Sequence, residues 1–313
     1  MNKPTIMNKP TILLVDDEER ILRSLRMLFF TGYNVRMTTD AHEAIRILRD
    51  EQVHVIVSDQ RMPIMQGSEL LSIARETSPA TMRILLTGYS DLEASIASVN
   101  EGEVFRYLLK PWDAADVKEV VAQAAAIATA TFAARQSPTA AVIETRQKLR
   151  ILVMDNDQNT ANAVEEILQH RAEVVWAQDE QHAKEILANQ DVSLVVADLT
   201  MGGKSVSYIL KTVKQFNPQT QTIVLTSFND TSHLIELINQ AQIIRYLPKP
   251  IRNNILARNL EFVIERFHAL GNSPELLTRQ SVEAIKDPQE KQLSGSFMGM
   301  LNRLRARPSV TQS

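Results

Sequence analysis

Three acids, one hydroxyl and one amine stand where four apolar stretches of the chain end. TILLV runs into Asp16 and Asp17, VHVIVS into Asp59, RILL into Thr87 and FRYLL into Lys110. Open α/β sheets bind ligands at the edge where parallel strands end, so these side chains are expected to meet there. Carboxylates suit Mg²⁺, which would bridge Asp59 to a phosphoryl group whose other oxygens Thr87 and Lys110 bind. The spacing predicts a phosphoryl-transfer site, although Asp59 alone could equally be a helix N-cap or a turn aspartate.

The elements around these residues alternate between strand and helix patterns. Apolar residues recur at helical spacing over 21–29, 41–48, 92–99 and 117–124, with apolar strands between them. This alternation predicts an α/β, doubly wound domain with a parallel five-stranded sheet and right-handed crossovers. The helical stripes, among them Leu92, Ile96 and Val99, are expected to face the core.

This constellation resembles the receiver domain of two-component response regulators. The wording SDQRMP, TGYSD and FRYLLKPW is similar to receivers attached to HD-GYP-type phosphodiesterases and to hydrogenase-type transcription regulators. The resemblance implies a CheY-like, flavodoxin-like (βα)5 fold and a cis bond between Lys110 and Pro111. It does not carry over an output activity.

The resemblance also implies a role for each residue of the site. Asp59 is the phosphoacceptor, Thr87 the switch hydroxyl, Tyr107 the switch aromatic and Lys110 the invariant lysine. The expected Mg²⁺ ligands are Asp16, Asp17, which makes the direct contact, Asp59 and the backbone carbonyl of Arg61.

From Leu149 the chain repeats the pattern of its first part. Adding 139 to a residue number maps each site residue without an insertion: Asp16 to Asp155, Asp59 to Asp198, Thr87 to Thr226, Tyr107 to Tyr246 and Lys110 to Lys249. Self-similarity over such a length predicts two receivers in tandem.

The second copy departs from the first at the metal site. Asn156 replaces Asp17, and Asp157 stands in the place of Glu18. Losing a carboxylate should weaken Mg²⁺ binding, unless Asp157 substitutes after a small backbone shift. Asp198 remains a candidate phosphoacceptor, the alternative being a degenerate receiver kept for dimerisation or docking.

Two other motifs compete for these acids. DNDQNT, which starts at Asp155, could begin the DxD signature of a haloacid-dehalogenase-type phosphatase or a calcium loop. A calcium loop needs glycine at its sixth position, which is Thr160 here. No GxGxxG or GxxxxGK[ST] follows any strand, which argues against nucleotide binding.

Composition sets the remaining limits. The 313 residues favour two domains, and a net charge of -3 gives no general attraction to nucleic acid or membranes. The absence of cysteine excludes disulfides, zinc–thiolate sites and thiol catalysis. No apolar run approaches the roughly 20 residues of a membrane helix, and the start of the chain lacks a signal-peptide core. We expect a cytoplasmic protein with no nucleic-acid partner and no stable membrane insertion.

The expected organisation has five parts: a duplicated N-terminal leader at 1–10, receiver domain 1 at 11–130, a linker at 131–148, receiver domain 2 at 149–270, and a C-terminal tail at 271–313. The hexapeptide MNKPTI occurs twice at the start, which suggests a second start codon or a cloning duplication. The linker is rich in alanine and threonine and broken by Pro138, and its first half can extend the preceding helix.

The tail is too short for a winged-helix or helix-turn-helix domain. Its apolar residues Phe297, Met300, Leu301 and Leu304 recur at helical spacing beside arginines, which predicts a short basic amphipathic helix. We expect the tail to be mostly irregular and disordered in the free protein, with this helix docking in a partner's groove or lying on an anionic surface.

These patterns predict a two-component response regulator, a switch rather than a turnover enzyme. A histidine kinase or phosphotransfer protein would phosphorylate Asp59, and Asp198 if the second site is active, with Mg²⁺ as cofactor. Signalling would pass through protein contacts to an unidentified downstream target, and pairing with a second copy is one such contact. The alternatives are the sensory part of a longer regulator with a cyclic-dinucleotide or DNA-binding output, and an unphosphorylated adaptor.

Overall fold

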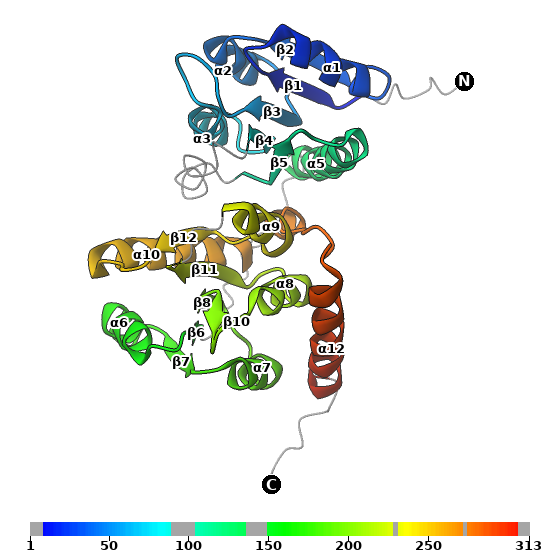
Figure 1. Ribbon diagram of the computed structural model, residues 1–313. Helices are drawn as coiled ribbons and strands as arrows, with labels where there is room; N and C mark the ends of the chain where they lie inside the picture. Colours follow the sequence, from blue (N-terminus) through cyan, green and yellow to red (C-terminus); the bar gives the residue numbers. More distant parts are fainter. Residues whose placement is uncertain (1–8, 89–103, 136–148, 228–230, 272–273, 306–313) are drawn as a thin grey trace. The chain divides into compact units, whose positions relative to one another are not determined.

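The computed structural model describes residues 9–88, 104–135, 149–227, 231–271 and 274–305 (Figure 1). Contacts divide the chain into two units, Met1–Thr139 and Ala140–Ser313. Each unit has its own five-stranded sheet.

The first unit is built on a parallel sheet in the order β2-β1-β3-β4-β5. Its strands are β1 (Thr11–Val15), β2 (Asn34–Thr38), β3 (Val55–Asp59), β4 (Met82–Gly88) and β5 (Arg106–Lys110). Its described helices are α1 (Glu19–Phe29), α2 (Ala41–Asp50), α3 (Gly67–Thr77) and α5 (Ala114–Arg135). Helices α1 and α5 cover one face of the sheet, and α2 and α3 cover the other (Figure 1). The helix expected over 92–99 lies outside the described residues.

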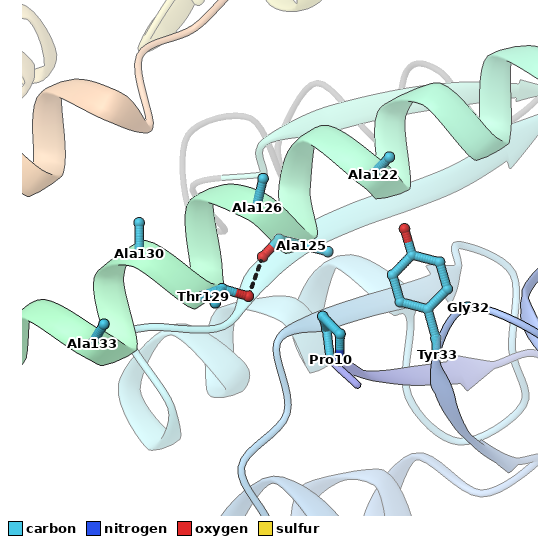
Figure 2. Close-up of a pocket in the computed structure, with 9 residues that line it drawn as sticks. All are labelled: Pro10, Gly32, Tyr33, Ala122, Ala125, Ala126, Thr129, Ala130 and Ala133. Carbon is cyan, nitrogen blue, oxygen red and sulfur yellow. Dashed lines mark hydrogen bonds between the residues drawn. The ribbon is translucent and has the colours of Figure 1, made fainter. Parts of the chain in front are cut away.

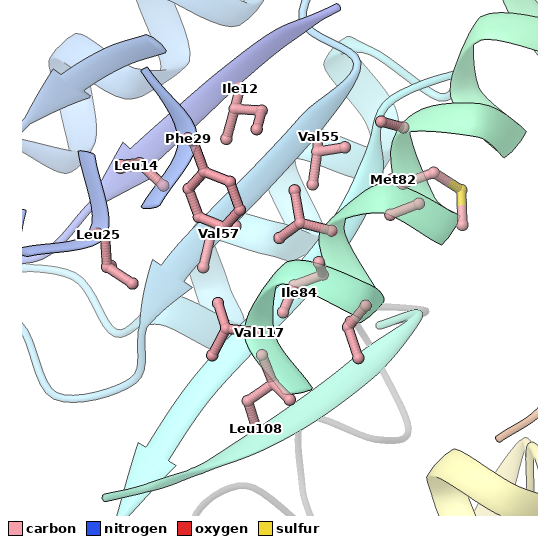
Figure 3. Packing of buried hydrophobic residues seen from close by; sticks show 14 of the residues in the cluster. Ile12, Leu14, Leu25, Phe29, Val55, Val57, Met82, Ile84, Leu108 and Val117 are labelled. Atoms are coloured by element: carbon pink, nitrogen blue, oxygen red, sulfur yellow. The ribbon is translucent and has the colours of Figure 1, made fainter. Parts of the chain in front are cut away.

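Continuous apolar runs form the central strands because both faces of the sheet are covered. All five residues of β3 are buried. On the α1/α5 face, Phe29 packs with Leu14, Val57, Ile84 and Val117 (Figure 3). Burying a side chain of this size stabilises the fold by about 1.5–3 kcal/mol. This core holds the ends of β1, β3 and β5 in place.

Helix α5 runs to Arg135, through the first residues of the predicted linker. Among the described residues, α5 is the one helix whose length and apolar composition would allow it to cross a membrane. The side chains from Val117 to Ala128 that lie on its inner face are buried in the core cluster. It is therefore the core helix of the first unit.

The second unit repeats this topology, with strands in the order β12-β11-β8-β6-β7. The strands are β6 (Arg150–Met154), β7 (Glu173–Ala177), β8 (Leu194–Ala197), β11 (Gln221–Thr226) and β12 (Arg245–Pro248). The helices around them are α6 (Gln158–Leu168), α7 (Glu180–Asn189), α8 (Ser207–Phe216), α9 (Thr231–Ala241) and α10 (Asn253–Gly271).

Strand pairing confirms the register found in the sequence. Ile12 pairs with Val55, and Ile151 pairs with Leu194, each 139 positions further on. The prediction of two doubly wound domains is confirmed.

The tail differs from the expectation. Residues 274–278 form α11 (Pro274–Thr278), and α12 (Pro288–Arg305) starts well before the predicted apolar stripe. Helix α12 packs on α7 and α8 and buries Phe297 and Leu301. The expected disorder is wrong for this segment, because tertiary packing supplies what an isolated helix of this sequence lacks.

Candidate functional site

The predicted acids of the first unit lie together at the carboxyl edge of its sheet. Asp16 follows β1, and Asp59 ends β3. Asp16, Asp17 and Asp59 each offer an oxygen within 4.8 Å of the others. Asp16 and Asp59 are buried, while Asp17 is exposed. Hard oxygen ligands at this separation fit one Mg²⁺ ion, so the residues present suit the expected metal.

Lys110, at the end of β5, joins two of these acids. Its Nζ donates to Asp59 Oδ1 at 2.7 Å and to Asp16 Oδ2 at 3.2 Å. Burial alone would lower the pKa of Lys110, but the hydrogen bonds and charges of the two carboxylates raise it above its ordinary value. Burial raises the pKa of Asp16, against the effects of the Glu18 amide and Lys110. The bond between Lys110 and Pro111 is cis, as predicted.

The other oxygen of Asp59 is held by the backbone. Asp59 Oδ2 accepts from the Arg61 amide at 3.0 Å. The Arg61 carbonyl remains a predicted metal ligand. Both Asp59 oxygens are thus oriented by donors that compensate negative charge, an arrangement that suits a carboxylate nucleophile.

Two residues of this site were missed in the sequence. The Gln60 amide donates to the Leu86 carbonyl, and the Gln60 side chain accepts from the Ser68 amide at 3.0 Å. Gly67 begins α3 so close to β3 that a Cβ there would stand 1.9 Å from the Asp59 carbonyl oxygen. The available signal was a glycine at the start of a helix, where a close backbone approach requires one.

Thr87 and Tyr107 are both buried on neighbouring strands. Thr87 Oγ1 donates to the Gly88 carbonyl at 3.3 Å. Tyr107 pairs with Leu85 in the β4–β5 ladder. Their strands flank the site, and their roles as switch hydroxyl and switch aromatic remain predictions.

The second unit keeps the lysine and its two acids. Lys249 Nζ donates to Asp155 Oδ2 at 2.7 Å and to Asp198 Oδ2 at 2.6 Å. Burial opposes the charge on Lys249, but the two carboxylates raise its pKa overall. Thr226 and Tyr246 are buried, as their counterparts are.

The acids of the second unit are arranged differently. Asp157 turns away to cap α6, accepting from the Asn159 amide at 3.0 Å. Asp155 accepts from the Asp157 amide at 2.9 Å and from Thr160 Oγ1 at 2.7 Å, in addition to its lysine. No group of three acids with ligand atoms in reach of one another forms around Asp198 among the residues that the structure describes.

The loop after Asp198 also takes another path. It forms a hairpin of β9 (Thr200–Met201) and β10 (Lys204–Ser205), with positive φ at Gly202 and Gly203. The Gly202 amide lies 3.3 Å from Asn156 Oδ1, so the amide side chain that replaces a metal ligand instead holds this hairpin. Val206 is buried at the position that corresponds to Gly67.

A separate concave region lies beside α5 in the first unit. This cavity has a volume of about 580 Å³. Figure 2 shows the residues that line it: Pro10, Gly32, Tyr33 and, on one side of α5, Ala122, Ala125, Ala126, Thr129, Ala130 and Ala133. Its lining is mostly alanine. Burial raises the pKa of Tyr33. The acids and Lys110 do not line this cavity, so the candidate chemistry lies elsewhere.

Residues 12–122 and 151–261 each match the response regulator receiver domain family. The chain belongs to this family. It is 41% identical over 114 residues to the hydrogenase transcriptional regulatory protein HoxA of Cupriavidus necator, covering 36% of this chain and 24% of that protein. It is 37% identical over 108 residues to the DNA-binding transcriptional regulator NtrC of Proteus hauseri, covering 34% of this chain and 23% of that protein. The chain spans about a quarter of the length of these curated relatives.

Solved receiver structures are similar as well. The signal receiver domain of an HD domain-containing protein from Pseudomonas fluorescens Pf-5 is 36% identical, with a TM-score of 0.40, covering 42% of this chain and 98% of that one. A CheY-like receiver domain protein from Methanospirillum hungatei JF-1 is 32% identical, with a TM-score of 0.37, covering 39% and 98%. The family match and the similarity to HoxA confirm the resemblance seen in the sequence, hydrogenase-type regulators included.

Proposed function

We propose that this chain is a two-component response regulator in which Asp59 accepts a phosphoryl group from a histidine kinase or a phosphotransfer protein. The observation that carries the proposal is the group of Asp16, Asp17 and Asp59 with Lys110 bound between two of its members. A carboxylate placed beside a fixed cation and a metal-binding pair has the features of a phosphoryl acceptor.

In this proposal an Asp59 oxygen attacks the phosphorus of a phosphohistidine. The new O–P bond makes an acyl phosphate, the P–N bond breaks, and the imidazole leaves with its electron pair. Lys110 offsets negative charge beside Asp59, and the Arg61 amide keeps the carboxylate in place. Asp16, Asp17, Asp59 and the Arg61 carbonyl would hold Mg²⁺, which when bound offsets the charge of the phosphoryl oxygens.

Asp198 is proposed as a weaker acceptor. Its lysine is in place, but Asn156 binds the hairpin and Asp157 caps a helix. The signal would leave the protein in the cytoplasm through contacts with a downstream protein or with a second copy, without turnover of a substrate. Because the relatives are longer, the sensory part of a regulator with a DNA-binding output is the second candidate.

The intact mass of the protein tests the proposal. The chain is incubated with Mg²⁺ and acetyl phosphate as wild type, Asp59→Asn and Asp198→Asn. Wild type and Asp198→Asn should gain one phosphoryl group, and Asp59→Asn should gain little. Equal labelling of Asp59→Asn and wild type would overturn Asp59 as the principal acceptor. If wild type is labelled but neither single variant is, both aspartates are required for labelling, and this result would also contradict the proposal.

A further inference from the structure

Helix α8 of the second unit is enclosed on all sides. Every residue from Ser207 to Lys214 is buried, whereas its counterpart α3 buries only Gly67, Leu70, Leu71 and Ala74. Helix α9 and the tail helix α12 both pack on α8. A helix that covers one face of a sheet normally keeps its other face in water, so an additional element covers the outer face of α8.

Two lysines on α8 reach that additional element. Lys211 and Lys214 are fully buried, a state that lysine adopts almost only when it is paired. Lys211 Nζ donates to Glu236 on α9 at 2.7 Å and also to Glu290 on α12. Lys214 Nζ donates to Gln280 Oε1 at 2.8 Å and to the carbonyls of Pro218 and Thr220.

These lysines distinguish the second receiver from the first. The corresponding positions of α3 hold Ser72 and Arg75, neither of which is buried. Because Lys214 is fully buried, loss of the Gln280 side-chain oxygen would take away one of the three acceptors of its amine and would be unfavourable. The two lysines are thus found in the receiver whose α8 binds the tail, and both of them donate to tail residues.

Helix α12 presents one stripe to this surface. Glu290, Ser294, Phe297 and Leu301 recur at steps of four, three and four residues, which places them on one side of a helix. Glu290 also accepts from Ser207 Oγ, and Ser294 is 2.7 Å from Thr212 Oγ1. Phe297 and Leu301 are buried below them. The stripe is polar at its start and apolar at its end, as is the surface that it covers.

The segment before α12 is bound to α9. The Glu283 amide donates to the Asn239 carbonyl at 3.1 Å. Gln242 Nε2 donates to the carbonyls of Arg279 at 2.9 Å and Ser281 at 3.2 Å. These bonds join the tail to α9 and to the residue that follows it. Lys211 contacts Glu236 on α9 directly and Glu290 on α12, so the same lysine binds both elements.

We propose that the face formed by α7, α8 and α9 of the second receiver is a binding site for an amphipathic helix with a glutamate in its first turn, and that residues 279–305 of the same chain are its resident ligand. The ligand is recognised through Lys211 and Lys214, and its presence holds α9 against α8. This proposal replaces the earlier expectation that the basic side of the tail helix binds a membrane or a partner's groove. The helix instead binds the chain's own second receiver, through the glutamate in its first turn.

Hydrogen exchange of the full-length chain tests this assignment. Glu290→Ala and Phe297→Ala remove the polar and the apolar end of the stripe, and Gln289→Ala, an exposed neighbour, is the matched control. Exchange over 288–305 and over 231–241 should rise about tenfold or more in the first two variants, since each loses a buried contact. Exchange in β6 and β8 should stay as in wild type, and the control should show no change.

Three results would overturn the proposal. The first is unchanged exchange over 288–305 in both variants. The second is an equal rise in β6 and β8, which would make α12 an inseparable part of the core. The third is a doubled molecular mass with concentration-dependent protection of 288–305, which would show that the tail of a second copy is the ligand.

A labelled peptide of residues 279–305 gives a second measurement. It should bind the full-length double variant Glu290→Lys and Phe297→Ala, in which the resident helix is released, and not the wild type, whose site is filled. The same peptide carrying Glu290→Lys should not bind. Equal binding of both peptides would contradict recognition through Lys211.

Discussion

The Cβ that Gly67 lacks would stand 1.9 Å from the carbonyl oxygen of Asp59. No real Cβ approaches a backbone atom that closely, so the start of α3 or the end of β3 would have to move. The backbone at Gly67 is also bonded to the end of β3, because the Gly67 amide donates to the carbonyl of Gln60, the residue after Asp59, at 3.0 Å. The first receiver thus positions its candidate acceptor by packing one helix start directly on the strand end.

Gly67→Ala should therefore lower the stability of the first receiver and displace Asp59. Overpacking of this kind costs about 1–3 kcal/mol, and phosphoryl transfer to Asp59 should slow with it. Chemical unfolding and the rate of phosphorylation by acetyl phosphate measure the two effects. Gly32→Ala is the control, because a Cβ there meets no atom within 4 Å. Identical unfolding curves for both variants would contradict this account.

The two sites should differ in affinity for Mg²⁺. In the second site Asn156 supplies no carboxylate, and Asp155 already accepts from Thr160 Oγ1 at 2.7 Å. The first receiver carries Asp17 and Ile21 at these places. The double variant Asn156→Asp and Thr160→Ile should raise Mg²⁺ affinity in an Asp59→Asn background, and more than Thr160→Ile alone. Stability without Mg²⁺ should fall, because the added acid repels its neighbours.

Calorimetric titration with Mg²⁺ and unfolding in chelator measure these effects. Equal affinity of the double variant and its parent would show that Asn156 does not limit the site.

Much of the fold was predictable because it repeats. The 139-residue register and the apolar strands predicted both sheets, and the strand ends brought Asp16, Asp59 and Lys110 together. The departures are tertiary. Gly67 stands in the sequence at the start of a predicted helix, but how closely this helix start approaches the end of β3 is set only in the folded chain. Helix α12 contacts α8 through Glu290 and Lys211, which lie 79 residues apart along the chain, and no local pattern predicts such a contact.

His54 should make the first receiver less stable in acid. Its Nδ1 accepts from the Thr11 amide at 3.0 Å, and burial lowers its pKa. The unfolded chain takes up a proton near the ordinary value of about 6.5, while the folded chain resists it. The contribution of His54 to the free energy of unfolding should therefore be constant above that pH. Below it, the free energy of unfolding should fall as the pH drops.

The second receiver supplies the control for His54. Ser193 stands at the corresponding place and accepts from the Arg150 amide at 3.3 Å. His54→Ser should keep the hydrogen bond and remove this part of the pH dependence. Denaturant unfolding between about pH 8 and pH 5 compares the two proteins. Parallel curves for His54→Ser and wild type would exclude His54 as the cause.

Thr87 should couple phosphorylation to a change beyond the site. In the receivers that this chain resembles, the phosphoryl group draws in a switch hydroxyl and a switch aromatic then changes its position; Thr87 and Tyr107 are predicted to fill these roles. Tyr107 is buried on β5, and α5 begins four residues after that strand and continues as a helix to Arg135. A rearrangement at Tyr107 would thus reach the residues that lead out of the receiver.

Thr87→Ala should leave Asp59 able to accept phosphate but abolish the response of the rest of the chain. The difference in binding between two states limits any such response, and near-complete switching needs about 5.5 kcal/mol. Small-angle scattering and sizing of wild type and Thr87→Ala, each with and without beryllium fluoride as a phosphoryl mimic, measure it. Wild type should change its dimensions or its mass, Thr87→Ala should not, and the control Thr226→Ala should respond as wild type does. An equal response of wild type and Thr87→Ala would rule out this route, because the hydroxyl would then carry no part of the coupling.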